Sequence, residues 1–244
     1  MKVTNIYNSS FCVELDKSIL IFDYANGQLP PIKKDKDVYV FISHRHSDHY
    51  TPDVFHFADT IEKIHFIVSD DLLQKKTIKF YINHMIGKKA LSLITWVKPN
   101  ETYRVGQIKV KTLKSTDLGV AFLVNVENQN IYHAGDLNMW AWPTDSEQMN
   151  LKAKNDFVDQ INKLKGIHID CAFLTLDPKQ ENLYAQGFDW FMKHTDTDNV
   201  FPMHFRDERK IVDFFLHDPI SEPYREKIKY TVDYSYIEPN KKLI

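Results

Sequence analysis

Hydrophobic and polar residues follow two spacings along this chain, and the changes between them predict where strands and helices lie. From Val3 to Tyr24, apolar and polar residues alternate or occur in short β-branched and aromatic runs, which predicts two or three strands joined by turns. A mostly apolar stretch from Asp37 to Ile42 predicts a buried strand. The chain therefore begins with a block of strands.

Helical signals follow this block. Thr51, Pro52 and Asp53 supply an N-cap residue, a proline at the first helical position and an acid in the first turn, so a helix is expected to begin there. Residues 69–71, Ser-Asp-Asp, are typical of a second helix start, and Gly87 is expected to end that helix. The first strands are thus predicted to carry helices on their outer side.

A second series of strands and helices completes the pattern. Strands are predicted at Ile94–Val97, Tyr103–Leu113, Val120–Val126, Gln129–His133 and Ile169–Leu176. A capping box at Thr144 and Glu147 predicts a helix that ends at residues 165–166, and further helices are expected near Glu181 and Arg206. This order predicts a mixed α/β (α+β) fold, a four-layer αββα sandwich, formed by residues 1–244 as a single domain.

Composition narrows the class of protein that this pattern can form. The chain has 244 residues, of which 43% are hydrophobic and 26% charged, so it carries enough apolar surface to fold around a core. Its formal net charge of -2 lacks the basic excess typical of nucleic-acid binding, so a nucleic-acid partner is not expected. No apolar run approaches the roughly 20 residues of a membrane helix, so no membrane partner is expected.

Cysteine usage and the N-terminal sequence bear on cellular location. The two cysteines, Cys12 and Cys171, are too few for a disulfide framework or a zinc site built from thiolates. The first residues lack the apolar core of a secretory signal. A reducing, cytoplasmic location is therefore expected, whereas nothing in the pattern predicts the oligomeric state.

The strongest chemical signal lies between the predicted strand at 37–42 and the predicted helix start at Thr51. Residues 43–49 read Ser-His-Arg-His-Ser-Asp-His and place four potential metal ligands within six positions, namely His44, His46, Asp48 and His49. Imidazole nitrogens and carboxylate oxygens bind zinc and related divalent ions, and a loop lets neighbouring side chains turn inward together. This segment therefore predicts a metal site.

The segment resembles the HxHxDH signature of the metallo-β-lactamase superfamily. That superfamily also places an aspartate after a later strand and a histidine near the C-terminus, and residues 132–136 (Tyr-His-Ala-Gly-Asp) and 202–205 (Pro-Met-His-Phe) stand in the same order here. The resemblance implies two divalent metal ions and roles in catalysis for Asp48 and Asp136. It assigns His44 and His46 to one ion, Asp48, His49 and His204 to the other, and Asp136 to both.

One position departs from the family pattern. The family usually supplies a third histidine to the first ion from a loop between the two halves, but no histidine lies between His84 and His133. Asp117, in a loop that follows one predicted strand and precedes another, is the natural substitute. A carboxylate ligand shifts the preference toward harder ions such as manganese, magnesium or ferrous iron. Zinc also accepts carboxylate ligands and is expected first. Alternatively, Asp117 only bonds to the backbone of its own turn near Gly119.

Two further neighbourhoods are candidates for contacting a substrate. Trp140 and Trp142 follow Asp136 in a proline-closed loop that could form an aromatic wall, or could anchor the loop as ordinary packing residues. Lys179 follows a strand end and is either a receptor for an anionic group or a solvated surface lysine. Together with residues 202–205, this stretch resembles the ascorbate-6-phosphate lactonase branch of the superfamily.

The expected activity is hydrolysis by a hydroxide that bridges two ions, acting on a small and anionic metabolite, first a lactone or ester. A phosphodiesterase or nuclease of the same superfamily is the second interpretation. A third is a domain that binds a metal or ligand without catalysis, because one family ligand is missing. No Gly-x-Ser-x-Gly frame or activated thiol supports a covalent mechanism instead.

Overall fold

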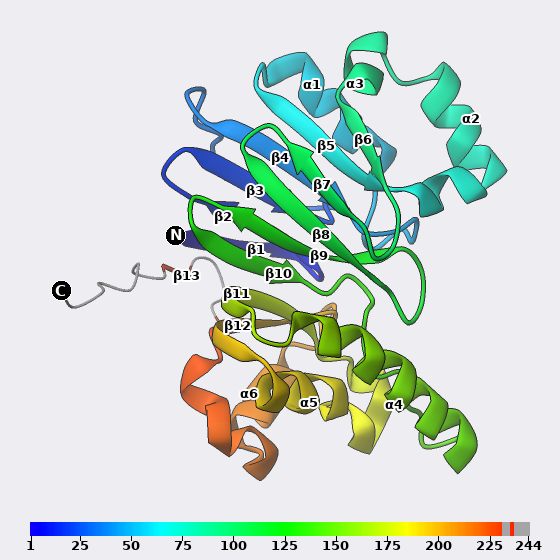
Figure 1. The fold of residues 1–244 in the computed structure, drawn as a ribbon, viewed down its shortest axis with the longest axis vertical. Helices are drawn as coiled ribbons and strands as arrows, with labels where there is room; N and C mark the ends of the chain where they lie inside the picture. The colour runs from blue at the N-terminus through cyan, green and yellow to red at the C-terminus, as the bar shows by residue number, and fades with distance from the viewer. Residues whose placement is uncertain (231–234, 237–244) are drawn as a thin grey trace.

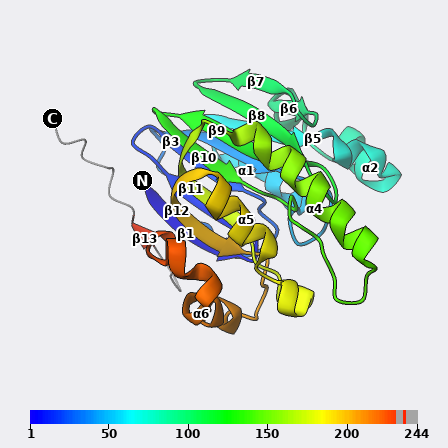
Figure 2. The same ribbon diagram turned by 60° about the horizontal axis from the view of Figure 1, so that its bottom comes forward.

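Two β-sheets pack face to face between two groups of helices in the computed structural model, which describes residues 1–230 and 235–236 (Figure 1). The first sheet has the strand order β13-β1-β2-β3-β4-β5-β6 and the second β12-β11-β10-β9-β8-β7. Helices α1, α2 and α3 cover the first sheet, and α4, α5 and α6 cover the second, as Figure 2 shows for the second group. The predicted four-layer sandwich is confirmed.

The elements have the following bounds. The strands of the first sheet are β1 (Lys2–Tyr7), β2 (Ser10–Glu14), β3 (Ser18–Phe22), β4 (Asp37–Ile42), β5 (Ile64–Ser69), β6 (Ile94–Val97) and β13 (Ser235–Tyr236). Those of the second are β7 (Thr102–Val105), β8 (Ile108–Lys114), β9 (Val120–Val126), β10 (Gln129–His133), β11 (His168–Thr175) and β12 (Asp196–Met203). The α-helices are α1 (Phe57–Thr60), α2 (Lys76–His84), α3 (Lys88–Ser92), α4 (Glu147–Ile161), α5 (Gln186–His194) and α6 (Lys210–His217). Short 3-10 helices are η1 (Pro52–His56), η2 (Asp70–Gln74), η3 (Asn162–Leu164), η4 (Pro178–Leu183) and η5 (Pro219–Lys227).

Alternation along the central strands builds two apolar layers. In β3, Leu20 and Phe22 join the cluster that contains residues of both sheets, whereas Ile19 and Ile21 join the cluster under α1, α2 and α3. Successive strand residues point to opposite faces, so a strand covered on both sides must be apolar throughout. This requirement explains why the sequence of β3 is apolar at four consecutive positions.

Several helix boundaries differ from the prediction. Thr51 makes no side-chain cap, and the turn that begins at Pro52 is a 3-10 helix leading into a four-residue α1. The hydroxyl of Ser146, rather than Thr144, caps α4 by accepting the N–H of Met149 at 3.2 Å. The capping box was therefore placed two residues too early, because both hydroxyl residues precede the same acidic first turn.

Two further segments are divided where one element was predicted. Residues 70–84 form η2 and then α2, with extended backbone at Lys75, and α3 was not predicted at all. The predicted strand Tyr103–Leu113 is the hairpin of β7 and β8, which turns at Gly106 with a φ of +55°. None of the helices within the described residues combines the length and apolarity that crossing a membrane requires.

Candidate metal centre

The predicted metal ligands lie in loops at one edge of the two sheets. Strands β3, β4 and β5 run parallel, so the loops that follow them leave the first sheet at the same edge, and β10, β11 and β12 do the same in the second sheet. A backbone hydrogen bond from the N–H of Val120 to the carbonyl of Ser43, 3.1 Å long, joins the two edges. Ligands as far apart in the sequence as His44 and His204, 160 positions, therefore meet in one site.

The carboxylate of Asp136 lies at the middle of four imidazoles. Its Oδ2 lies 3.1 Å from the Nε2 of His44 and 3.8 Å from the Nδ1 of His46. Its Oδ1 lies 3.1 Å from the Nε2 of His49 and 3.4 Å from the Nε2 of His204. Each oxygen therefore faces its own pair of histidines. Donor atoms that share a tetrahedral ion at about 2.0–2.1 Å lie roughly 3.4 Å apart, which is close to these spacings.

Two buried atoms of this cluster lack hydrogen-bond partners within the described residues. The Nε2 of His49 and the Oδ1 of Asp136 are enclosed, and although they lie 3.1 Å apart they are not aligned for a hydrogen bond. Buried polar atoms are normally satisfied, and an ion between them would satisfy both. The nitrogen and oxygen donors present suit zinc, manganese or iron, so the residues fit a divalent metal.

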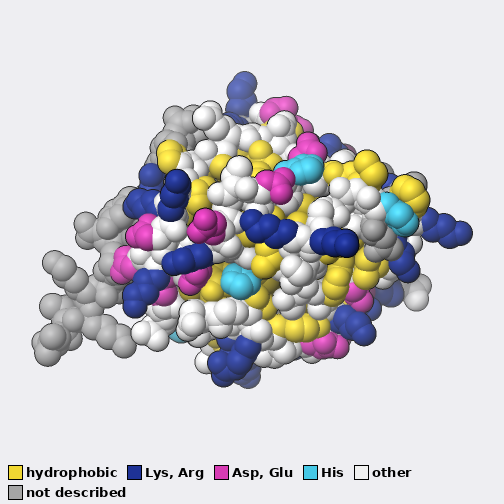
Figure 3. Space-filling model, turned by 90° about the horizontal axis from the view of Figure 1, so that it is seen from above, with side chains coloured by type: hydrophobic (Ala, Val, Ile, Leu, Met, Phe, Trp, Pro, Cys, Tyr) yellow, Lys and Arg dark blue, Asp and Glu magenta, His cyan; other side chains and the backbone are white. Residues whose placement is uncertain are grey.

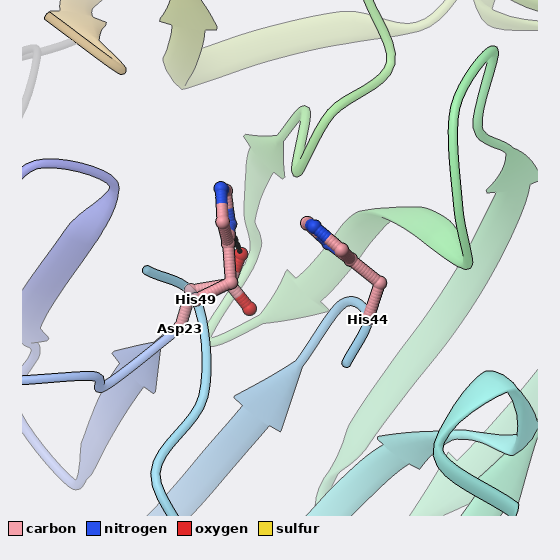
Figure 4. Close-up of side chains that lie close together, drawn as sticks. All are labelled: Asp23, His44 and His49. Carbon is pink, nitrogen blue, oxygen red and sulfur yellow. Dashed lines mark hydrogen bonds and ion pairs between the residues drawn. The ribbon is translucent and has the colours of Figure 1, made fainter. Parts of the chain in front are cut away.

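Hydrogen bonds behind the rings fix the two buried histidines of residues 43–49, which we call the motif loop. The Nδ1 of His49 lies 2.8 Å from the Oδ2 of Asp23, a fully buried carboxylate at the end of β3. The hydroxyl of Ser43 donates to the same oxygen at 2.6 Å and lies 2.9 Å from the Nδ1 of His44. Figure 4 shows His44 and His49 projecting side by side from the loop after β4, with Asp23 approaching from the end of β3. These contacts aim the Nε2 atoms of both histidines at Asp136.

His204 is held in the same way from the second sheet. Its Nδ1 lies 3.2 Å from the Oδ2 of Asp177, which follows β11, and its backbone has a φ of +69°, a conformation uncommon outside glycine. His133 is not part of the cluster. Its ring is buried, stacks on Phe22 at 4.9 Å and lies 2.9 Å from the carbonyl of Ser9, as a packing role predicts.

Glycine is required at two places where loops of the second sheet, those after β8 and β10, pass close to Ser43. A Cβ on Gly119, which has a φ of +67°, would lie 1.9 Å from the carbonyl oxygen of Ser43. A Cβ on Gly135 would lie 2.8 Å from the Cβ of Ser43. Only glycine permits both approaches. The two glycines therefore let the second sheet bring Asp136 against the motif loop.

Burial and neighbouring charges shift the pKa values of Asp136 and His49 in opposite directions. Burial raises the pKa of Asp136, but the charge of His49 and the approach of His44 and His46 outweigh it and hold that pKa well below its usual range. Burial lowers the pKa of His49, but the charge of Asp136 and the contact with Asp23 outweigh it and hold that pKa well above its usual range. The folded chain therefore favours an ionised carboxylate at the centre of the cluster.

The ligands nearer to solvent are held less firmly. Side-chain exposure is 44% for His46, 43% for Asp117 and 26% for Asp48. The Oδ2 of Asp117 lies 3.7 Å from the Nδ1 of His46, but Asp117 is not part of the compact groups formed by the other predicted ligands. Its backbone N–H donates to the hydroxyl of Ser115 at 3.1 Å, a bond of the turn that does not involve the carboxylate. Ligation by Asp117 stays a prediction.

A cavity of about 420 Å³ opens over the cluster. Trp140 and Trp142 form one wall, with indole planes 8° apart and ring centroids 6.1 Å apart. Trp140 also packs edge-on against His204 and donates its indole N–H to the carbonyl of Asp136 at 2.9 Å. Lys179 lines the cavity together with Arg206. All three predicted substrate-contact residues thus face the cavity.

Sequence reasoning missed three residues that shape the site, Asp23, Asp177 and Arg206. The Nη2 of Arg206 lies 3.4 Å from the Oδ2 of Asp48, and its backbone has a φ of +49°. Each aspartate stands within two residues of the end of an apolar strand, and that position is the signal that could have marked it. What the sequence lacked was the strand pairing that places those two strand ends beside the motif loop.

A family model described as the β-lactamase superfamily domain matches residues 2–158, which is more than half of the chain. The chain belongs to the β-lactamase superfamily. The predicted superfamily is confirmed, and the matched residues include the whole motif loop and Asp136. No curated protein matches the sequence of this superfamily member.

Several solved structures share the fold of this β-lactamase superfamily chain. Igni18, a metallo hydrolase from Ignicoccus hospitalis, is 14% identical with a TM-score of 0.62, and the match covers 97% of this chain and 99% of that one. A possible metal-dependent hydrolase from Veillonella parvula is 10% identical with a TM-score of 0.60, and covers 97% and 99%. The β-hydroxylase CmlA is 10% identical with a TM-score of 0.63, and this chain spans only 54% of it. CmlA from Streptomyces venezuelae is a diiron enzyme, so the fold carries more than one chemistry.

Proposed function

We propose that this protein is a metal-dependent hydrolase that opens a lactone or ester in a small, anionic metabolite. One observation carries the proposal, namely the carboxylate of Asp136 with each oxygen facing two histidines. Membership of the superfamily and the similar fold of Igni18, a metallo hydrolase, support it. The Nε2 of His49 is buried and has no hydrogen-bond partner among the residues that the structure describes, which supports a metal at this place over a purely structural polar cluster.

The proposed ligands divide into two sets that share Asp136. His44, His46 and Asp117 would hold the first ion, and Asp48, His49 and His204 the second. Zinc is the first choice, because imidazole nitrogens and carboxylate oxygens are among its usual ligands. Manganese and iron are the alternatives, because Asp117 adds an oxygen donor where the family usually has a histidine.

When bound, such ions supply Lewis acidity, which activates water near neutral pH and stabilises negative charge on a carbonyl or phosphoryl oxygen. The chain contributes orientation: Asp23, Ser43 and Asp177 hold the histidine rings. Asp48, 26% exposed and beside the cavity, is the carboxylate placed to exchange a proton with water or product. Asp136, which the surrounding histidines keep ionised, would contribute to catalysis by holding both ions rather than by transferring a proton.

An anionic substrate is favoured by the cations at the cavity. Lys179 is exposed and makes no side-chain ion pair within the described residues, so its charge is free to meet a phosphate or carboxylate. Trp140 and Trp142 offer a flat apolar wall to the rest of the molecule. A phosphorylated lactone, as expected for the ascorbate-6-phosphate lactonase-like branch, would satisfy both features.

Two properties of the whole chain belong to this proposal. Cys12 and Cys171 are buried free thiols, which suits the reducing cytoplasm. Residues 1–244 are expected to act as a single domain, because the site takes ligands from both sheets. The expected partner is a small-molecule substrate.

The test pairs metal analysis with a matched substrate screen. Protein purified without added ions should contain one or two equivalents of a divalent metal, and activity should disappear on chelation and return with one added ion. The screen compares lactones and esters with and without a phosphate, and phosphodiesters. Turnover of phosphodiesters alone would select the nuclease alternative, whereas bound metal without any turnover would select the non-catalytic alternative.

A further inference from the structure

Residues 72–100 form a strongly basic segment in a chain whose overall charge is close to neutral. Residues 72–100 contain six lysines and no acidic residue, although the frequency in the whole chain would place about four acidic residues in a segment of this length. The segment forms the end of η2, the helices α2 and α3 on the outside of the first sheet, and β6 at the edge of that sheet. A protein of net charge -2 therefore concentrates positive charge at one end of one layer.

Large apolar side chains lie among these lysines. Phe80 is 61% exposed and Met85 62% exposed, whereas Ile82 and Ile86 of the same segment are buried against the first sheet. Figure 3 shows this side of the molecule, with apolar, histidine and lysine side chains side by side. We call this surface the α2–α3 patch and define it by Lys75, Lys76, Lys79, Phe80, Met85 and Lys88.

The other large apolar side chains that are similarly exposed have different surroundings. Met149 and Leu151 lie on α4 beside Glu147 and a pair formed by Lys152 and Asp156. Phe214 lies on α6 next to Asp213. By contrast, none of the four lysines of the α2–α3 patch forms an ion pair within the described residues. Single-sign charge and exposed apolar groups coincide only in this patch among the described surfaces.

We propose that the α2–α3 patch binds the surface of an anionic lipid membrane. Ammonium groups on a helix attract anionic headgroups, and apolar side chains between them enter the boundary of the acyl chains. This type of binding needs no spanning helix, so the absence of one from the sequence does not bear on it. The proposal concerns the surface of a bilayer, whereas the expectation of no membrane partner rested on the lack of an apolar run long enough to span one.

The residue types favour a membrane over a nucleic acid. All the cations of residues 72–100 are lysines, which act as point charges, and none is an arginine, the residue suited to bidentate recognition of phosphates and bases. Phe80 stacks on His84 of its own helix, with ring centroids 4.3 Å apart, so one face of its ring is already occupied. A lipid interface can bury the ring by its edge. A nucleic-acid base would have to stack on a ring face, and one of the two faces is covered.

The test is co-sedimentation of the full chain with vesicles. Vesicles with about one-third phosphatidylglycerol should bind the protein at about 0.01 M salt and release most of it at about 0.15 M, whereas phosphatidylcholine vesicles should not bind it. The variant Lys76→Glu/Lys79→Glu should weaken binding more than about tenfold, because each lysine contributes about fivefold. The variant Phe80→Ser/Met85→Ser should weaken it about threefold or more, through the lost apolar contact.

Matched controls separate this patch from surface charge in general. Lys152→Glu/Lys154→Glu and Met149→Ser/Leu151→Ser make the same changes on α4 and should leave vesicle binding unchanged. Thermal melting and metal content establish that every variant is folded. The proposal is overturned if the wild-type protein does not sediment with anionic vesicles, or if the α4 variants lose as much binding as the α2 variants. It is also overturned if an oligonucleotide binds more tightly than the vesicles and displaces the protein from them. Hydrolase activity enters none of these readouts.

Discussion

The two sides of the Asp136 carboxylate differ in how firmly the chain holds their ligands. On one side, His49 and His204 are buried, and each ring has an aspartate behind it, Asp23 or Asp177. On the other side, His46 and Asp117 are 44% and 43% exposed. His44 of this side is also buried and is held by Ser43, so this side has one preorganised histidine where the side of His49 and His204 has two.

This difference indicates that the two proposed ions are not bound equally. Ligands that are fixed before the metal arrives lose little conformational freedom on binding, whereas exposed ligands must be ordered by the ion. The position between His49 and His204 should then be the tighter one. The position between His46 and Asp117 should be the one that exchanges and that determines which metal is selected.

The largest expected effect comes from removing the group that both sides share. Asp136→Asn keeps the size of the side chain but removes its charge, so both ions lose a ligand and activity should fall by about a thousandfold or more. Metal content measured with turnover checks this. Retention of two ions with wild-type turnover would show that Asp136 is not the shared ligand.

The next test removes the support behind the buried side. Asp23→Asn should lower metal affinity by about 10- to 100-fold, because His49 loses the partner that orients its ring and Ser43, which holds His44, loses the acceptor of its hydroxyl. The matched control is Asp59→Asn, which removes an aspartate from an exposed pair with His56 and should change nothing. Equal metal affinities for the two variants would contradict a preorganised side.

Acidification should weaken the buried side most. The charge of Asp136 and the contact with Asp23 outweigh burial and raise the pKa of His49 well above its usual value, so at neutral pH a proton must leave before an ion binds. Metal affinity should therefore fall as the pH is lowered, by about tenfold per pH unit for every proton that the ion displaces. Competition with a chromophoric chelator between about pH 8 and about pH 6 measures this slope. A pH-independent affinity would exclude a protonated His49 in the metal-free protein.

The open side is tested by changing Asp117. If its carboxylate is a ligand, Asp117→Ala should lose about tenfold in affinity for one ion while the other is retained, and Asp117→His should restore binding with a stronger preference for zinc. Titration with zinc and with manganese distinguishes these outcomes. Unchanged metal stoichiometry and affinity in Asp117→Ala would show that Asp117 is not a ligand. It would then be only a residue of the turn in which its backbone N–H donates to the hydroxyl of Ser115.

The smallest expected effect concerns the cavity beyond the ions. Lys179→Ala should raise KM about fivefold for a phosphorylated substrate and leave KM for the neutral analogue unchanged. Lys193→Ala, which removes an exposed lysine paired with Asp189 on α5, is the matched control. A similar change in KM for both substrates would make Lys179 an ordinary surface residue.

Local sequence was sufficient for much of the site because several ligands are neighbours in the chain. Four of them fall within residues 44–49, directly after a strand whose bounds, Asp37–Ile42, match the prediction. Asp136 and His204 could be named from the family pattern, and both follow strands in the structure. Helix starts were less certain, as Thr144 and Ser146 show, because two cap residues close together offer the backbone equivalent bonds.

By itself, then, the sequence determined the layers of the fold, the motif loop and the residue types suited to a divalent metal, since these depend on spacing and on the chemistry of adjacent side chains. Only the tertiary structure placed Asp23 behind His49, Asp177 behind His204 and Arg206 beside Asp48. It also left Phe80 and Met85 of the lysine-rich segment exposed, while Ile82 and Ile86 pack against the first sheet. The physical reason is that these contacts depend on which strand ends share an edge, and pairing between strands far apart in the chain is determined by the packing of the whole core.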